Sequence, residues 1–206
     1  INSEEVFAEA HAKSKLPGGE VVNEGDTTAA LAAAAQTITN TYPYNSTPHA
    51  CMETMNCKIS AANGRVDVYV GAQNPPGALA AVAEEMGVDP ENVYVHNAFL
   101  GGGFGRRSRN DDSKQAAAIA KQVGRPVKML WSREEDMLQG KHRPYSVGRF
   151  EGGLDANGNV TALKVTVAAH SLTAHTRPSR IENGIDSGVL RGIRDTAYIV
   201  PNQYMD

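Results

Sequence analysis

The residues best suited to chemistry lie in one glycine-rich segment, which reads NAFLGGGFGRR over residues 97–107. Glycine permits positive φ angles and lets a ligand approach bare backbone N–H groups. A helix predicted just after the segment directs further N–H donors and the positive end of its dipole at the same place. Arg106 and Arg107 add two guanidinium groups that can grip phosphate in a bidentate manner. This chemistry favours a large anionic, phosphorylated ligand.

The segment matches neither of the common nucleotide-binding loops. A dinucleotide fingerprint counted from Gly101 and Gly103 requires glycine at position 106, and a P-loop counted from Gly101 requires glycine at 106 and lysine at 107. The chain has Arg106 and Arg107 there. A flexible surface hairpin or linker is the alternative, because loops often carry glycine. Three apolar side chains argue against a solvated linker: Phe99, Leu100 and Phe104.

Composition indicates a globular protein with a real core. The chain has 206 residues, of which 41% are hydrophobic, so it is long enough for one large domain or two small ones. A net charge of −3 gives no general case for binding nucleic acid or a membrane surface. No apolar run approaches the roughly 20 residues needed to span a bilayer. Cys51 and Cys57 are too few and too close for a disulfide framework and poorly spaced for zinc, so we expect buried thiols and no metal ligands.

The order of predicted elements places the glycine segment between a strand and a helix. Asn63-Gly64 between two alternating runs is a strong hairpin signal. Asp111, Asp112 or Ser113 is expected to cap the helix that follows the glycines, and Ser132 with Glu135 forms a capping box. The predicted helices cover residues 29–35, 77–86, 111–123 and a short stretch from 133, and the predicted strands cover residues 37–42, 57–61, 65–70, 93–96, 127–131, 149–154 and 160–168.

This pattern predicts an α+β fold, a two-layer α/β arrangement with mixed sheets and β-hairpins. Residues 1–24 are predicted to be a polar N-terminal segment and residues 25–206 one α/β domain, with a long loop over 171–192. The chain begins with Ile1 and ends on what looks like a strand entering a turn. We therefore expect a piece of a longer protein whose domain is incomplete at its C-terminus.

Four blocks of the chain occur in order and read TPHACMETMNC at 47–57, AQNP at 72–75, FLGGGFGRR at 99–107 and VKMLWSREED at 127–136. Together they resemble the molybdenum-binding subunit of the xanthine dehydrogenase/aldehyde oxidase family. The Gly-Arg-Arg ending and the Met-Glu-x-Met-Asn-Cys run resemble the isoquinoline 1-oxidoreductase β-subunit branch in particular. The resemblance covers roughly residues 22–206, and it implies a molybdopterin-binding-domain-like fold.

The resemblance implies a bacterial molybdenum hydroxylase. In that family the metal is held by the dithiolene of a molybdopterin, usually the cytosine dinucleotide form in bacteria, and the protein supplies no direct metal ligand. Water supplies the oxygen, and two electrons leave through [2Fe-2S] clusters on a partner subunit. The implied partners are this iron–sulfur subunit and a small-molecule substrate, with no nucleic acid and no membrane span. Members of the branch are often exported or membrane-associated through partner subunits. The sequence does not assign this chain to a cell compartment.

The resemblance assigns roles to several residues. Gln73 matches the glutamine whose amide hydrogen-bonds an oxo ligand of molybdenum; the alternative is a turn glutamine before two prolines. The cofactor-binding loop matches Gly102, Gly103, Phe104 and Gly105, with Phe104 bordering the substrate channel. Arg106 and Arg107 either contact the pyrophosphate or pair with Asp111 and Asp112 across the start of the helix. His49 lies in a matched block and is expected near the active-site entrance.

Two departures narrow the expected activity. Purine hydroxylases of the family carry a glutamate just after the glycine loop, where this chain has Ser108, so an aldehyde or apolar N-heterocyclic aromatic substrate is more plausible. The general-base glutamate lies in the family beyond the point where this chain stops, and Glu53, Glu134 and Glu135 do not match it. We therefore expect no catalytic residue within the chain and no activity from residues 1–206 alone. The alternatives are a non-catalytic module that binds a phosphate ligand or serves assembly, and a quinone-dependent aldehyde dehydrogenase.

Overall fold

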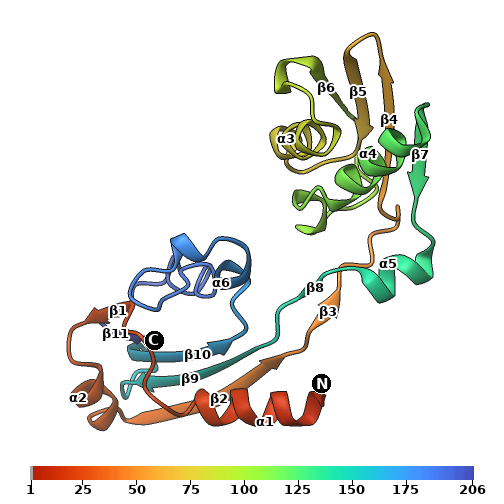
Figure 1. The fold of residues 1–206 in the computed structure, drawn as a ribbon. Coiled ribbons are helices and arrows are strands. Elements are labelled where there is room, and N and C mark those ends of the chain that lie inside the picture. Colours follow the sequence, from red (N-terminus) through yellow and green to blue (C-terminus); the bar gives the residue numbers. More distant parts are fainter. Residues whose placement is uncertain (1) are drawn as a thin grey trace. The chain divides into compact units, whose positions relative to one another are not determined.

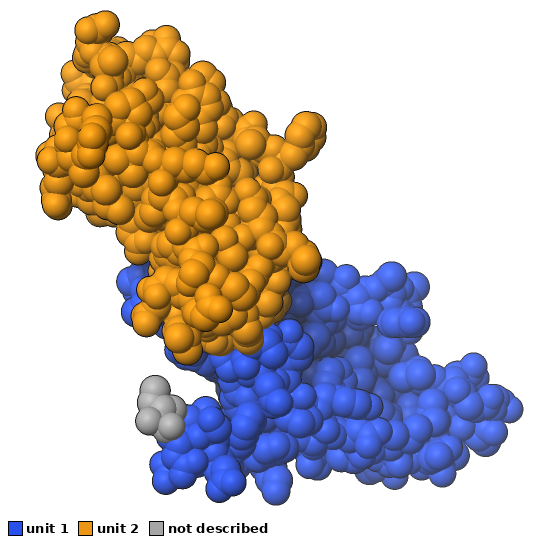
Figure 2. Space-filling view, turned by 90° about the vertical axis from the view of Figure 1, so that its right-hand side faces the viewer, with its two compact units in different colours: residues 1–47, 144–206 blue, residues 48–143 orange. Residues whose placement is uncertain are grey.

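A computed structural model describes residues 2–206, which fall into two compact units (Figures 1 and 2). Unit 1 joins the chain up to Thr47 to Pro144–Asp206, and unit 2 is Pro48–Arg143. Two short strands, β3 (Thr47–Pro48) and β8 (His142–Arg143), pair with each other. The predicted domain boundary at residue 24 stays a prediction. No helix among residues 2–206 is long and apolar enough to cross a membrane.

Unit 2 is a four-stranded sheet with two helices packed on it. The strand order is β6-β5-β4-β7, where β5 and β6 are parallel and the other pairs antiparallel. The strands are β4 (Asn56–Ala62), β5 (Arg65–Val70), β6 (Val93–Asn97) and β7 (Val127–Leu130), and the helices are α3 (Pro75–Met86), η1 (Pro90–Asn92), η2 (Arg106–Ser108), α4 (Asp111–Val123) and α5 (Arg133–Gln139).

The core of unit 2 follows from alternation along its strands. In β5 every second residue is buried, while the residues between them are more exposed. The buried side chains meet small residues of α3 and α4, so the helices approach the sheet closely. The fully or nearly fully buried members of this cluster include Ile59, Val66, Val68, Val82 and Ala116.

Unit 1 is a five-stranded sheet in the order β1-β11-β10-β9-β2, in which β10 and β11 are parallel. Helices α1 and α2 pack on β9 and β10. Val147, Ala162, Val165 and Met205 are buried in this unit. The strands are β1 (Val22–Glu24), β2 (Gln36–Tyr44), β9 (Ser146–Leu154), β10 (Val160–Ala169) and β11 (Asn202–Met205), and the helices are α1 (Ser3–Lys13), α2 (Thr27–Ala32), α6 (Leu172–Thr176) and η3 (Pro178–Arg180).

The predicted fold class is confirmed, with mixed sheets and β-hairpins in both units. The helix predicted over 111–123 has the same bounds as α4, but its predicted cap is wrong. Its N-cap is Asn110, in the left-handed region at φ 56°, and makes no side-chain capping bond. Asp111 and Asp112 are instead first-turn acids, and Asp112 Oδ1 accepts from the N–H of Ser113. Ser132 does cap α5, accepting from the N–H of Glu135.

Candidate functional site

The glycine-rich segment leaves the end of β6 and turns into the short helix η2 within unit 2. Two hydrogen bonds tie the start of the segment to the end of β5. Ala98 N donates to Val70 O at 2.9 Å, and Asn97 Oδ1 accepts from Ala72 N at 2.8 Å. The β5–β6 pairing therefore brings the segment at 98–105 beside residues 71–73, which follow β5.

Positive φ angles shape the loop. Gly102 has φ 101° and Gly105 has φ 95°, which glycine adopts without steric cost. Phe104 between them has φ 51°, an uncommon conformation for a bulky side chain. Phe104 is 64% exposed, so burial of its side chain does not account for the strain. A strained residue with an exposed aromatic ring is typical of a ligand-facing position.

Some backbone N–H groups of the loop donate to a protein acceptor, and others, called open here, have none in the part of the chain that the structure describes. The Gly101 N–H donates to Glu53 Oε2 at 2.9 Å, and the Gly105 N–H donates to Gln73 Oε1 at 3.0 Å. Between them, the N–H groups of Gly102, Gly103 and Phe104 have no acceptor among residues 2–206. Successive open N–H groups in a turn form an anion-binding concavity.

Gln73 lies directly against this loop. Its backbone N–H donates to Arg107 O at 3.0 Å, and its side-chain oxygen accepts from Gly105. A Cβ built on Gly103 would lie 2.7 Å from Gln73 Cδ, so only glycine fits there with Gln73 in place. The capping role in the turn before α3 belongs to Asn74, whose Oδ1 accepts from Gly77 N at 3.2 Å. The structure thus brings Gln73 together with Gly103 and Gly105, while their contact with a cofactor stays a prediction.

The two arginines that end the segment have different environments. Arg106 is 3% exposed, and both terminal nitrogens donate to Asp111, at 2.6 and 2.9 Å. Burial opposes the charged form of each, but the mutual hydrogen bonds raise the pKa of Arg106 and lower that of Asp111. The pairing of Arg106 with Asp111 is confirmed, whereas that of Arg107 with Asp112 is wrong, because Arg107 pairs with Glu53.

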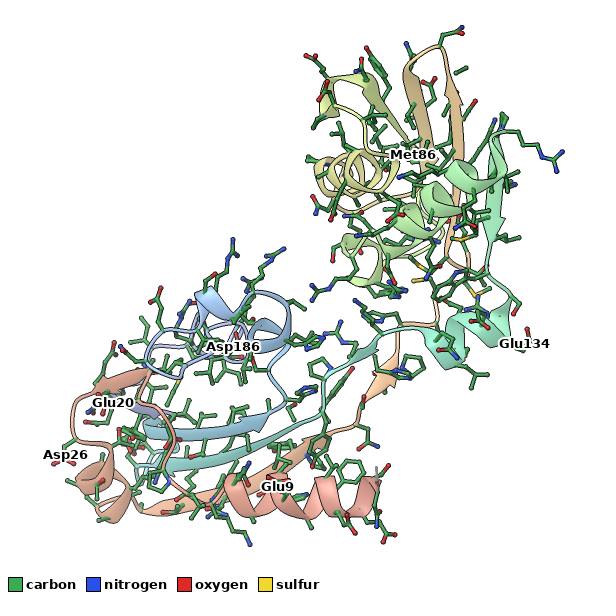
Figure 3. The ribbon with its side chains drawn as sticks, viewed as in Figure 1. Glu9, Glu20, Asp26, Met86, Glu134 and Asp186 are labelled. Carbon is green, nitrogen blue, oxygen red and sulfur yellow. The ribbon has the colours of Figure 1, made fainter. Side chains whose placement is uncertain are left out.

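Several nearby polar residues face the loop or the protein rather than a ligand. Ser108 Oγ donates to Gly105 O at 2.6 Å, so this hydroxyl closes the loop. His49 Nδ1 lies 2.9 Å from Lys141 O, and burial lowers the pKa of the imidazole. Glu134 lies exposed in the first turn of α5 (Figure 3). Among residues 2–206 no group of three or more His, Cys, Asp or Glu side chains is placed to hold a metal ion.

Sequence reasoning missed Glu53 as a support of the loop. Its carboxylate accepts from Asn56 Nδ2 and from the Gly101 N–H, and its own N–H donates to Gly101 O at 3.0 Å. Burial opposes ionisation of Glu53, but these hydrogen bonds and the charge of Arg107 outweigh it and lower the pKa. Glu53 and Gly101 are 48 positions apart, so no local spacing reveals the contact.

The lowered pKa of Glu53 predicts a pH-dependent contribution to the stability of unit 2. This contribution is present above the unfolded-state pKa of about 4.3 and is lost as the pH falls through the lower folded-state value. The melting temperatures of the wild type and Glu53→Gln should therefore differ at neutral pH and converge in acid. Trp131, the one tryptophan of the chain, reports the melting of unit 2 by fluorescence. A difference that stays constant into acid would contradict the assignment.

Comparison with known proteins gives consistent matches. The family profile of the molybdopterin cofactor-binding domain matches residues 9–187. Xanthine dehydrogenase of Blastobotrys adeninivorans is 34% identical over 152 residues, which are 72% of this chain and 11% of that protein. Isoquinoline 1-oxidoreductase subunit beta of Brevundimonas diminuta is 35% identical over 118 residues, or 57% of this chain and 15% of that protein. A membrane-bound aldehyde dehydrogenase [pyrroloquinoline-quinone] of Gluconacetobacter polyoxogenes is 29% identical over 174 residues, 84% of this chain and 22% of that protein.

Solved structures share the fold. Aldehyde oxidoreductase from Desulfovibrio gigas matches with a TM-score of 0.73 at 18% identity, over 90% of this chain and 20% of that chain. Quinoline 2-oxidoreductase from Pseudomonas putida 86 matches with a TM-score of 0.69 at 19% identity, over 94% of this chain and 25% of that chain. The chain therefore spans at most a quarter of the length of these relatives and structures.

Proposed function

Because this chain belongs to the molybdopterin cofactor-binding domain family, we propose that its glycine loop and Gln73 form one wall of a molybdenum–molybdopterin site. The observation that carries the proposal is the placement of Gln73 against a loop with three successive open N–H groups. The whole protein is then a molybdenum hydroxylase, and this chain supplies part of its large subunit.

The residues present fit such a cofactor. The open donors are the neutral N–H groups of Gly102, Gly103 and Phe104, and neutral donors suit a large anionic group without adding charge. The side-chain nitrogen of Gln73 has no acceptor among residues 2–206, so the amide can donate outward while its oxygen holds the loop. The contact of Arg106 with the cofactor stays a prediction, since Asp111 holds both terminal nitrogens in this structure.

When bound, the cofactor supplies oxidation of the substrate with water as the oxygen source. Within this chain, the Gln73 amide and the N–H groups of Gly102, Gly103 and Phe104 would hold the cofactor by donating hydrogen bonds to it. Phe104 presents its exposed ring as one side of the substrate channel and excludes water from it. The Ser108 hydroxyl donates to Gly105 O, and the position where purine hydroxylases of the family carry a glutamate offers no carboxylate here. This favours an aldehyde or an N-heterocyclic aromatic substrate.

The remaining parts of the proposal concern the rest of the protein. The cofactor is the cytosine dinucleotide form, and [2Fe-2S] clusters on a partner subunit accept the electrons. The catalytic base lies outside residues 1–206, so this chain alone is inactive. A quinone-dependent aldehyde dehydrogenase is a second candidate, because one relative carries that name. Pterin and molybdenum in the purified protein separate the two.

Replacing Gln73 tests the proposal. Gln73→Ala removes one donor to the cofactor and one acceptor of the loop, so the pterin content of the complete gene product should fall about tenfold, as expected for one or two lost hydrogen bonds to a charged partner. Gln122→Ala, on the exposed face of α4, is the matched control and should keep its pterin. Pterin is released by denaturation and measured by fluorescence after oxidation. Equal pterin in both variants would contradict the role of Gln73.

A further inference from the structure

Arg107 is buried at the base of the loop, with no part of its side chain exposed. Its guanidinium donates to four main-chain carbonyls. Nε donates to Gly102 O at 3.0 Å, Nη1 to Gly71 O at 3.4 Å, and Nη2 to Glu53 O at 2.7 Å and Thr54 O at 3.1 Å. The carboxylate of Glu53 lies 3.1 Å from Nη2 and supplies the opposite charge.

These acceptors come from three separate stretches of chain. Gly102 belongs to the glycine loop, Gly71 to the turn after β5, and Glu53 and Thr54 to the segment before β4. All four acceptor residues lie outside the strands, so their carbonyls are not paired within a sheet. A planar guanidinium with five N–H donors can hold several carbonyls at once, whereas an ammonium on a flexible stem cannot reproduce that fork.

Arg107 also fixes Gln73 through its own backbone. The carbonyl of Arg107 accepts from the Gln73 N–H at 3.0 Å, while its side chain holds Gly102. The same residue therefore holds Gln73 through its backbone carbonyl and the glycine loop through its side chain. Glu53 completes the arrangement, because it exchanges two hydrogen bonds with Gly101 as well as pairing with Arg107.

We infer that Arg107 is a positioning residue of this site, which sets the separation between Gln73 and the open N–H groups without facing the cofactor. The inference rests on the proposed function, because that function gives the positioned groups a ligand. The contacts of Arg107 are observed independently of that function. Burying a guanidinium is costly unless its hydrogen bonds are satisfied, and here carbonyls of all three stretches satisfy them. A residue that only stabilised the core would not need to contact both the glycine loop and Gln73.

The first test replaces Arg107 by lysine in the complete gene product. Arg107→Lys keeps the charge but loses most of the carbonyl contacts, so pterin content should fall at least about tenfold, the loss expected when a buried hydrogen-bonded charge is left poorly satisfied. Arg65→Lys is the matched control, since Arg65 forms an exposed bidentate pair with Asp67 in the same unit. Its pterin content should stay at the wild-type level.

Amide hydrogen exchange rates of the cofactor-free protein test the positioning role directly. In Arg107→Lys, exchange should accelerate for the amides of Gly101, Gly105 and Gln73, while α3 and α4 keep their protection. Loss of protection throughout α3 and α4 would overturn the inference, because Arg107 would then be a general element of the core. This readout needs no cofactor, so it decides the role of Arg107 even if the wild type holds no pterin and the proposed function fails.

Chemical rescue gives a second and sharper arm. Arg107→Ala should regain pterin and loop protection when the protein is prepared with millimolar guanidinium, and should not respond to methylammonium at equal concentration. Rescue by guanidinium alone is expected because only the planar ion can donate to the same carbonyls. Full pterin in Arg107→Lys, or equal effects of the two ions on Arg107→Ala, would overturn the inference.

Discussion

Gly103→Ala is expected to remove most of the pterin and molybdenum from the protein while leaving it folded. The new Cβ would lie 2.7 Å from Gln73 Cδ and 2.8 Å from Gln73 Oε1, so the Gln73 side chain must move out of its place. The atoms that yield are the end of a flexible side chain, so stability should change by no more than about 1 kcal/mol. Moving one donor by an ångström is enough to weaken the site by about tenfold or more.

The measurement is pterin and metal content per protein, with the melting temperature recorded in parallel. Gly152→Ala is the matched control, because nothing lies within 4 Å of its added Cβ and its φ is ordinary. Gly152→Ala should keep both contents. If Gly103→Ala also keeps them, the space between Gly103 and Gln73 has no part in holding the cofactor.

Ile59→Ala is expected to produce the largest loss of stability. Ile59 is fully buried in β4, within the cluster beneath α3 and α4. Truncation leaves a cavity that close-packed neighbours fill only in part, so the free energy of unfolding of unit 2 should fall by about 2–5 kcal/mol. Urea unfolding followed by Trp131 fluorescence measures this unit, since Trp131 lies within it.

Ile119→Ala is the matched control in the same unit. Ile119 is 42% exposed on α4, and alanine is the better helix former, so the change should stay within about 0.5 kcal/mol. Equal shifts of the urea midpoint in the two variants would show that the assigned core is wrong.

The parts of the fold that the sequence predicted correctly are those set by neighbouring residues, such as turns and helix ends. Asn63 and Gly64 both have positive φ, 51° and 77°, as the predicted hairpin turn requires. The bounds of α4 follow from its periodicity and from Gly124, which ends it in the left-handed region. Its N-cap was missed because Asn110 makes no side-chain capping bond. The left-handed backbone conformation of Asn110 sets the start of α4, whereas Asp111 and Asp112 are residue types that also favour an N-cap and so misled the prediction.

The candidate site was predictable only where its contacts are close in sequence or belong to a motif. Arg106 meets Asp111 five positions later, and that pair was among the predicted alternatives. Arg107 meets carbonyls 36 and 54 positions away, and a main-chain carbonyl has no signature in a sequence. Two adjacent arginines therefore have different roles that only the tertiary structure separates. The family motif assigned Gln73 to the cofactor, but neither the motif nor the spacing predicted its hydrogen bond with Gly105.

The central claim is that the glycine loop and Gln73 hold a molybdenum-bearing molybdopterin. The most direct test is the molybdenum and pterin content of the complete gene product, produced with an iron–sulfur partner subunit in a host that makes the cofactor. The account predicts one molybdenum and one pterin per protein, with both contents reduced in Gln73→Ala and Gly103→Ala. Protein from such a host that contains neither molybdenum nor pterin would contradict it and leave the loop as a binding element for some other anionic ligand.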